Sequence, residues 1–249
     1  MLGTRGRHGD QSRWGHLRRI QPRRHRIAVD TGPGVGPGAQ RRLLDIAVAG
    51  GTLLVLWPAF LFVAAAALVS TGGSPIYRQQ RVGQGGVPFT LLKFRTLRAR
   101  MPGPEVTPPG DPRVTRFGGL LRRTSIDELP QMLNVLLGHM TLVGPRPESV
   151  ALAVRYPAEC RFVFRYRPGL TGPSQVLEHD DWVLRQVPDA EGYYLSDLVP
   201  RRVATDMTFL ERPSFTKTVL WLVNTARYVA GAGTPSTAAR DDRHAAPVR

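Results

Sequence analysis

Cysteine is nearly absent from this 249-residue chain, and lysine is almost as scarce. Cys160 is the single cysteine, so an intramolecular disulfide and a cysteine-based metal cluster are both excluded. We interpret Cys160 as a small buried apolar side chain rather than a nucleophile. Among the 34 basic residues only Lys93 and Lys217 are lysines, so arginine supplies nearly all of the positive charge. A cytoplasm-facing fold is compatible with this composition.

Acidic residues are too few to balance the arginines. The 19 Asp and Glu residues leave a formal net charge of +15. Such an excess suits a partner rich in phosphate, which could be nucleic acid, an anionic membrane surface or a diphosphate substrate. Composition alone does not choose among these three partners.

One long apolar run interrupts this polar chain, at residues 46–69, and its only exceptions are Gly50, Gly51 and Thr52. As a straight helix it would extend about 36 Å, and a bilayer hydrocarbon core is about 30 Å thick. Pro58 lies near its middle, where the ring removes a backbone hydrogen bond. The run therefore predicts a membrane helix that is kinked or broken into two half-helices.

Basic residues flank both ends of this run: Arg41 and Arg42 before it, and Arg78, Arg81, Lys93 and Arg95 after it. Because cytoplasmic segments are the ones enriched in Lys and Arg, a single crossing would place one cluster on the unfavourable side. A hairpin that enters the bilayer and returns keeps both clusters in the cytoplasm. We therefore expect a re-entrant helix over residues 41–72, with an ordinary single crossing as the alternative.

The rest of the chain divides into two tails and a central domain. Residues 1–40 carry eight Arg and two Asp and predict a disordered basic tail attracted to anionic lipid headgroups. Residues 231–249 predict a second disordered tail. Between them, residues 73–230 read as a small α+β domain with a strand at 87–94, a helix at 129–137 and a helical segment at 209–229. Trp221 and Tyr228 of that last segment suit a membrane interface.

Four arginine-bearing motifs surround one adjacent pair of carboxylates. They are Lys-Phe-Arg-Thr at 93–96, Asp-Pro-Arg-Val-Thr-Arg at 111–116, Leu-Arg-Arg-Thr-Ser-Ile-Asp-Glu at 121–128 and Val-Gly-Pro-Arg-Pro at 143–147. A guanidinium group presents a planar fork of donors that matches phosphate oxygens. Pro145 and Pro147 restrict the backbone around Arg146, which predicts a rigid phosphate clamp. For any one of these arginines, a solvated side chain in a surface turn is the alternative.

The carboxylate pair is Asp127 and Glu128. Ser125 and Glu128 match a capping box at the start of an apolar helix, and such a helix start also suits a phosphate group. Paired carboxylates among arginines suit phosphoryl transfer as well. One carboxylate can hold a divalent metal while the other attacks phosphorus or activates the attacker. The capping and catalytic interpretations are compatible.

In their order along the chain, these motifs resemble the bacterial sugar transferases, the monotopic phosphoglycosyltransferases that act on polyprenol phosphate. The resemblance runs from Arg42 to about Thr225. Besides the motifs above, it includes Arg42-x-x-Asp45, the proline-broken apolar run, Gln-x-Arg-Val-Gly at 79–83, Leu-Pro-Gln at 129–131, Asn-Val-Leu-x-Gly at 134–138 and Arg-Pro-Gly-Leu-Thr-Gly at 167–172. So many motifs in one order make a coincidence very improbable.

The resemblance implies a reaction and a set of site residues. A sugar-1-phosphate would pass from a nucleotide (UDP) sugar to undecaprenyl phosphate through a covalent aspartyl phosphosugar, which initiates glycoconjugate or exopolysaccharide synthesis. Asp127 would be the nucleophile and Glu128 a Mg²⁺ ligand, with Asp127 as the second carboxylate at the metal. The expected substrate-binding residues are basic: Lys93, Arg95, Arg113, Arg122, Arg146 and Arg167.

The resemblance also implies a fold class, mixed α/β. A re-entrant membrane hairpin helix precedes a small cytoplasmic α+β catalytic domain with interfacial amphipathic helices, at the cytoplasmic face of the inner membrane. With one apolar run, the chain is expected to be a minimal catalytic module. Its expected partners are the nucleotide-sugar, polyprenyl phosphate and membrane lipids.

Two other functions compete with this one. A noncatalytic membrane-anchored partner in polysaccharide assembly would use the hairpin as an anchor, but the intact pair Asp127 and Glu128 argues against degeneration. A nucleic-acid binder would explain the basic tail. However, the sequence has no zinc-ligand spacing, recognition-helix pattern or aromatic-basic RNA motif, so we expect no nucleic-acid partner.

Overall fold

The computed structural model describes residues 34–99, 101, 111–178, 183–184 and 186–231. The predicted terminal tails therefore lie almost wholly outside the described residues. In chain order the principal elements are α1 (Ala39–Thr71), β1 (Ile76–Val82), β2 (Pro88–Phe94), α2 (Arg116–Arg123), α3 (Gln131–Leu136), β3 (Thr141–Val143), α4 (Val150–Ala153), β4 (Gly169–Thr171), α5 (Pro173–Leu177), α6 (Ala190–Tyr193), α7 (Val199–Leu210) and α8 (Phe215–Val229). Helices and strands are mixed, as predicted.

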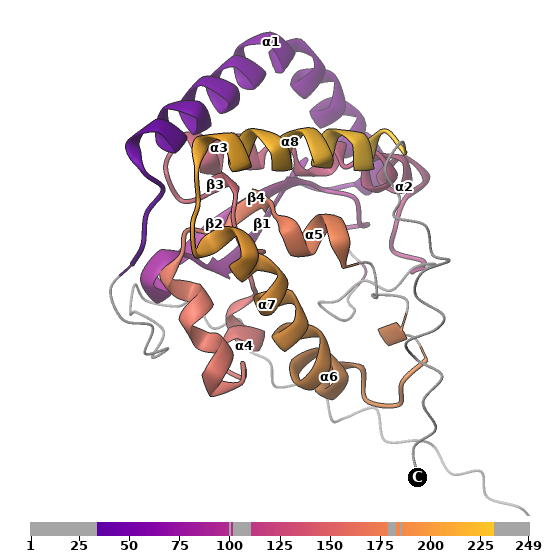
Figure 1. Ribbon diagram of the computed structural model, residues 1–249. Coiled ribbons are helices and arrows are strands. Elements are labelled where there is room, and N and C mark those ends of the chain that lie inside the picture. Colours follow the sequence, from indigo (N-terminus) through magenta and orange to yellow (C-terminus); the bar gives the residue numbers. More distant parts are fainter. Residues whose placement is uncertain (1–33, 100, 102–110, 179–182, 185, 232–249) are drawn as a thin grey trace, which may run out of the picture.

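Helix α1 forms an arch above the rest of the molecule (Figure 1). It is continuous over 33 residues and contains Pro58. The arch bends near its middle, as expected where a proline ring removes one hydrogen bond and clashes with the preceding turn. Within the described residues, α1 is the one helix long and apolar enough to cross a membrane, and almost none of its most apolar stretch is buried. The predicted kink is thus present, and the helix is bent without being interrupted.

Charged side chains at the start of α1, the first arm of the arch, bind this part of the helix to the domain. Arg41 donates to the carbonyl oxygen of Val143 at 2.7 Å. Asp45, which is fully buried, accepts from the backbone N–H of Leu142 at 2.9 Å and from the Thr141 hydroxyl at 2.8 Å. Buried charged groups are stable only when they are hydrogen-bonded in this way, so the start of α1 has a defined place on the domain.

The second arm returns to the same domain. The backbone N–H of Ala99 donates to the carbonyl oxygen of Thr71 at 3.0 Å, at the end of the helix. The rings of Phe60 and Phe94 meet at 5.6 Å between centroids. A straight helix of this length would measure about 50 Å. Because α1 is bent, both of its ends contact the same compact domain.

Two small sheets lie below the arch. Strands β1 and β2 form an antiparallel hairpin in which Val82 pairs with Pro88 and Ile76 with Phe94, which confirms the predicted strand at 87–94. Strands β3 and β4 pair in parallel, with Val143 opposite Thr171. The core beneath them includes Leu91, Val135, Met140, Leu142, Val199 and Phe209, each no more than 1% exposed.

Helices α8, α3 and α2 lie between the arch and the sheets (Figure 1). Each keeps large apolar side chains exposed: Phe215, Leu220 and Val223 on α8, Leu133 on α3 and Leu120 on α2. Exposed apolar patches of this kind mark interaction surfaces in soluble and membrane-associated proteins. Most of the large exposed apolar side chains among the described residues thus lie on or near the arch.

Two predicted helices differ in detail from the structure. The helix predicted at 129–137 is shorter in the structure, where a 3₁₀ turn, η3 (Ile126–Glu128), is followed by a turn at residues 129–130 and α3 runs from Gln131 to Leu136. The segment predicted at 209–229 is interrupted. Phe209 and Leu210 are the last residues of α7, and α8 starts at Phe215. Pro213 lies between the two helices and has no backbone N–H to donate.

Candidate active site

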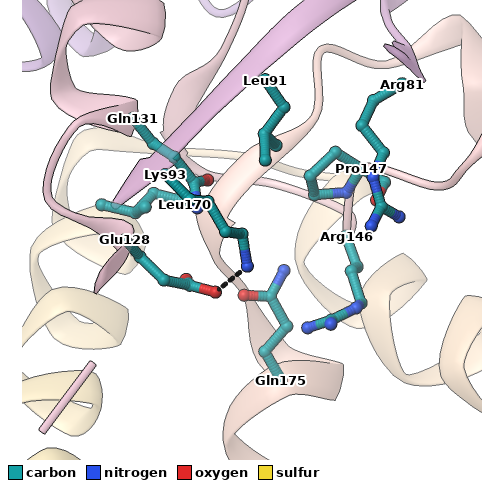
Figure 2. Close-up of a pocket in the computed structure, with 9 residues that line it drawn as sticks. All are labelled: Arg81, Leu91, Lys93, Glu128, Gln131, Arg146, Pro147, Leu170 and Gln175. Atoms are coloured by element: carbon teal, nitrogen blue, oxygen red, sulfur yellow. Dashed lines mark hydrogen bonds and ion pairs between the residues drawn. The ribbon is translucent and has the colours of Figure 1, made fainter. Parts of the chain in front are cut away.

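One pocket gathers polar side chains from β1, β2, the 3₁₀ turn at Ile126–Glu128, α3, α5 and the loop after β3 (Figure 2). Its lining is rich in cations and amides: Arg81, Leu91, Lys93, Glu128, Gln131, Arg146, Pro147, Leu170 and Gln175. Three positive groups face a single carboxylate there. Such a balance of charge favours an anionic ligand with more than one negative charge.

The β1–β2 hairpin supplies one wall of the pocket. Arg81 pairs directly with Phe89 across the hairpin, and Leu91 and Lys93 follow at two-residue intervals on β2. Because side chains alternate between the faces of a strand, Arg81, Leu91 and Lys93 emerge on the same face. The strand pattern thus delivers two cations to one side of the pocket.

The turn that carries Asp127 and Glu128 differs from the predicted capping box. Ser125 has a left-handed backbone, with φ of 56°, and its side chain makes no capping hydrogen bond. The backbone N–H of Glu128 instead donates to the carbonyl oxygen of Ser125 at 3.1 Å. A residue with positive φ cannot place its hydroxyl as an N-cap residue does, so the capping prediction is wrong, whereas the phosphate site at this turn stays a prediction.

Lys93 and Glu128 form an ion pair inside the pocket, with 2.6 Å between Nζ and Oε1. Although burial disfavours the charged carboxylate, Lys93 and Arg146 hold the pKa of Glu128 below its ordinary value. Glu128 is therefore anionic at neutral pH. The described residues donate no hydrogen bond to the second carboxylate oxygen of Glu128, Oε2. This oxygen can therefore bind a ligand.

Asp127 lies beside Glu128 but is more deeply buried, with 8% of its surface exposed. Burial raises the pKa of Asp127 to about 6, against the opposing effect of Lys93. The adjacent charge of Glu128 contributes to this rise. A desolvated carboxylate of this kind is anionic at pH 7 and is less strongly stabilised by water than an exposed one, which suits a nucleophile.

Arg146 reaches the pocket from the loop that follows β3. The pairing of β3 with β4 brings this loop against the 167–172 motif, where a Cβ on Gly169 would lie 2.1 Å from the backbone nitrogen of Gly144. Only glycine permits so close a backbone approach. The two motifs are therefore packed into one rigid unit, and Arg146 projects from it into the pocket, as Figure 2 shows.

A buried acid supports the cationic wall. Glu148 is 4% exposed and lies 3.5 Å from Arg81, and it accepts a hydrogen bond from the Tyr156 hydroxyl at 2.9 Å. Arg81 also donates to the carbonyl oxygen of Pro147 at 3.1 Å. These contacts fix the guanidinium of Arg81 beside the Arg146 loop.

The structure does not bring every predicted arginine to this pocket lining. Arg113 pairs with Asp111, with 2.7 Å between Nη2 and Oδ2, and both side chains are buried. Arg122 donates to the Thr96 hydroxyl at 2.9 Å. These partners hold loops in place, and the predicted role of the two arginines in substrate binding stays a prediction.

Arg95 and Arg167 also contact protein groups outside the pocket lining. Arg95 donates to the carbonyl oxygen of Ser74 at 2.7 Å and stacks over the Tyr77 ring. Arg167 donates to the Gln84 side chain at 3.2 Å. Their substrate contacts are likewise untested.

Sequence reasoning missed several pocket residues, notably Gln131 and Gln175. Gln131 ends the 121–131 motif, and Gln175 follows the 167–172 motif by three residues. The signal that the sequence offered for both glutamines was their position in or next to a motif. Glutamine is also common on surfaces, so residue type alone gave no reason to select either side chain.

Glu128 and Asp127 suit a Mg²⁺ ion that takes its remaining ligands from substrate phosphates and water. Within the described residues no group of three or more His, Cys, Asp or Glu side chains could cage a metal. Mg²⁺ is commonly bound through one or two carboxylates, with waters and substrate phosphates completing its shell. Glu128 faces the pocket and Asp127 adjoins it, which meets this smaller requirement.

A pocket rich in cations beneath an apolar arch suits a membrane-associated enzyme that handles phosphorylated substrates. Residues 38–232 match the family model described as bacterial sugar transferase. This match covers most of the chain. The chain therefore belongs to the bacterial sugar transferase family, an enzyme family, as its motifs predicted.

Curated relatives share substantial identity with the chain. It is 41% identical over 184 residues to a UDP-glucose:undecaprenyl-phosphate glucose-1-phosphate transferase of Caulobacter vibrioides, an alignment that covers 72% of this chain and 65% of the relative. It is 37% identical over 163 residues to the exopolysaccharide production protein ExoY of Rhizobium meliloti, covering 58% of this chain and 71% of the relative. An Escherichia coli transferase of the same name as the Caulobacter protein is 41% identical over 141 residues, covering 55% of this chain and 30% of the relative.

Proposed function

We propose that this protein transfers a sugar-1-phosphate from a UDP-sugar to undecaprenyl phosphate and so begins the assembly of an exopolysaccharide or another glycoconjugate. The observation that carries the proposal is the pocket in which Lys93, Glu128 and Arg146 converge next to the buried Asp127. Two relatives are named for this reaction with UDP-glucose, which supports the donor and acceptor classes.

Asp127 is the proposed nucleophile. Its carboxylate attacks the phosphorus that bears the sugar, the bond to the bridging oxygen of the diphosphate breaks, and UMP leaves with that oxygen. A phosphate oxygen of undecaprenyl phosphate then attacks the aspartyl phosphosugar. The bond from phosphorus to Asp127 breaks, the carboxylate is restored, and the lipid diphosphate sugar is the product. Two successive attacks remove the need to hold both substrates in one site together.

The basic residues counter the negative charge that this attack meets. Lys93 and Arg146 flank Glu128 and lower the repulsion between a carboxylate and a diphosphate. Glu128, with Asp127 next to it, would hold Mg²⁺, which when bound neutralises diphosphate charge. Arg81, held by Glu148, adds a third cation to the same wall.

The arch of α1 is the proposed membrane anchor. Its exposed side chains include Leu54, Val55, Trp57, Leu61 and Phe62, which are at least 59% exposed. Insertion of these side chains into the bilayer would be favourable, and the return of both arms to the domain supports a re-entrant helix. The apolar faces of α8, α3 and α2 would then lie along the cytoplasmic surface of the inner membrane.

The noncatalytic alternative is not favoured. An anchored assembly partner would not require Lys93, Glu128 and Arg146 to converge in one pocket. The named relatives include transferases, and the nucleophile position is occupied by an aspartate.

Purified protein in detergent, supplied with Mg²⁺, undecaprenyl phosphate and a panel of UDP-sugars, tests the proposal by release of UMP. At least one donor should support turnover, and Asp127→Asn should abolish it. Glu128→Gln should lower it and raise the Mg²⁺ concentration needed. With donor alone, intact mass spectrometry should find one added sugar-phosphate on wild-type protein and none on Asp127→Asn. Sequential kinetics without any adduct would remove the covalent step, and no turnover with any donor would remove the proposed reaction.

A further inference from the structure

Gln175 on α5 presents a polar group that the protein leaves without a partner. Its side-chain Nε2 atom is buried and, among the described residues, has no hydrogen-bond acceptor. Figure 2 shows the carboxamide directed into the pocket between Lys93 and Arg146. A buried N–H group without an acceptor destabilises the folded state, so such groups call for an explanation.

None of the groups that line the pocket accepts a hydrogen bond from Gln175 Nε2. The Lys93 ammonium and the guanidinium groups of Arg81 and Arg146 carry only donors. Glu128 is the carboxylate of the pocket lining, and its Oε1 atom accepts from Lys93 at 2.6 Å, while neither of its oxygens accepts from Gln175. The pocket thus combines several donors with few acceptors, and the complementary ligand is rich in acceptor oxygens.

A buried carboxyl on a neighbouring helix fixes the position of Gln175. Asp206 of α7 is 3% exposed, and it accepts from the backbone N–H of Ser174 at 2.9 Å and from the Ser174 hydroxyl at 3.0 Å. Ser174 immediately precedes Gln175, so these bonds anchor the first turn of α5 against α7. The carboxamide is therefore held in place before a ligand arrives.

We infer that Gln175 donates a hydrogen bond from Nε2 to a phosphoryl oxygen of the substrate, and that the diphosphate of the UDP-sugar is the ligand it orients. The inference rests on the proposed function. A neutral donor fits this place because Lys93, Arg81 and Arg146 already supply positive charge. The neutral carboxamide of Gln175 would make a directional hydrogen bond to the phosphate. A fourth cation at this place would instead compete with the phosphate by pairing with the Glu128 carboxylate.

Kinetics of Gln175→Ala and Gln175→Glu, with UDP-sugar and undecaprenyl phosphate varied separately, test the contact. Gln175→Ala should lower kcat/KM for the UDP-sugar about ten- to a hundredfold, as expected for loss of one hydrogen bond to a charged group. Gln175→Glu has nearly the same shape but should lower it more, because a carboxylate repels the phosphate. Gln80 is the matched control: it is exposed on β1 and bonds Thr90, so the same two substitutions there should leave both kcat/KM values unchanged.

The outcomes separate the possible roles of the side chain. A loss confined to the UDP-sugar supports the donor contact, and a loss confined to undecaprenyl phosphate assigns the same hydrogen bond to the acceptor phosphate. A lowered melting temperature with equal losses on both substrates indicates a structural role and overturns the inference. Full activity of Gln175→Glu also overturns it. Gln175→Asn replaces the alanine variant if that variant does not fold. Wild-type protein without turnover overturns the proposed function and this inference together, whereas active wild type with unaffected variants overturns the inference alone.

Discussion

The ionisation of Asp127 should govern the pH dependence of the reaction. Burial raises its pKa to about 6, and only the carboxylate form can attack phosphorus. We therefore predict that kcat/KM falls about tenfold per pH unit below pH 6 and levels off above pH 7. Initial rates of UMP release between pH 5 and 8 measure this profile.

A second buried carboxyl titrates nearby and requires a control. Burial raises the pKa of Asp206 to about 7, although its hydrogen bonds with Ser174 oppose this shift. The variant Asp206→Asn keeps the shape of the side chain, so its profile should retain the midpoint near pH 6 that Asp127 sets. A flat profile between pH 5 and 7 in wild-type protein would contradict the role of Asp127.

Arg146 and Arg155 make a matched pair of arginines. Arg146 lines the pocket, whereas Arg155 is exposed and pairs with the exposed Glu191. Replacement of Arg146 by Ala should reduce kcat/KM by one to two decades, which corresponds to about 1.5 to 3 kcal/mol for a charged hydrogen bond. Arg155→Ala should remain within a factor of about two, since exposed ion pairs contribute little. Equal activity of the two folded variants would place Arg146 outside the site.

At the scale of an element, helix α2 positions the turn that bears Asp127. Gly118 packs on the 94–96 segment, where an added Cβ would lie 2.2 Å from the Thr96 carbonyl oxygen. The adjacent Gly119 has room, with its nearest neighbour at 3.9 Å. Arg122 of the same helix donates to the Thr96 hydroxyl, so α2 and this segment form one packed unit.

This contrast predicts opposite outcomes for two neighbouring substitutions. Gly118→Ala must displace α2 and should destabilise the protein by about 1–3 kcal/mol while lowering activity. Gly119→Ala should be neutral or slightly stabilising, because alanine has the higher helix propensity. Melting temperatures and UMP release in the same detergent compare the two. If Gly118→Ala matches Gly119→Ala in both measurements, α2 does not position the catalytic turn.

At the scale of the whole molecule, the arch predicts a topology in the membrane. Both ends of α1 contact one domain, through Arg41 at the start and Thr71 at the end. A cysteine at Gly38 and one at Val87, each exposed, should therefore react from the same, cytoplasmic, side of intact vesicles. The variants need a background without Cys160, which is buried and tolerates replacement by alanine at modest cost.

The labelling pattern discriminates between the two topologies directly. Protection of both cysteines from an impermeant maleimide in right-side-out spheroplasts, with reaction in inverted vesicles, fits the re-entrant arch. Reaction of the two positions from opposite sides would establish a single crossing. In that case the contacts of Ala99 with Thr71 and of Arg41 with Val143 could not form in the membrane together.

Much of this protein could be predicted from local patterns in the sequence. The apolar run with Pro58 gave the bent helix, the 87–94 segment gave a strand, and the ordered motifs around Asp127 gave the family. Each of these signals resides in residues that are close together in the chain. Hydrophobic periodicity and the stereochemistry of proline act over a few residues, so the sequence alone displays them.

The composition of the pocket was decided by tertiary structure. Arginine suits phosphate, carboxylate and carbonyl partners equally well, so the sequence could not reveal that Arg113 pairs with Asp111 while Arg146 faces the pocket. The left-handed turn at Ser125 likewise depended on packing around it and overrode the capping pattern. Gln175 lines the same pocket as Lys93 because the parallel pairing of β3 and β4 and the anchor at Asp206 bring distant segments together. Contacts between residues far apart in the chain follow from the packing of the whole domain, which no local pattern encodes.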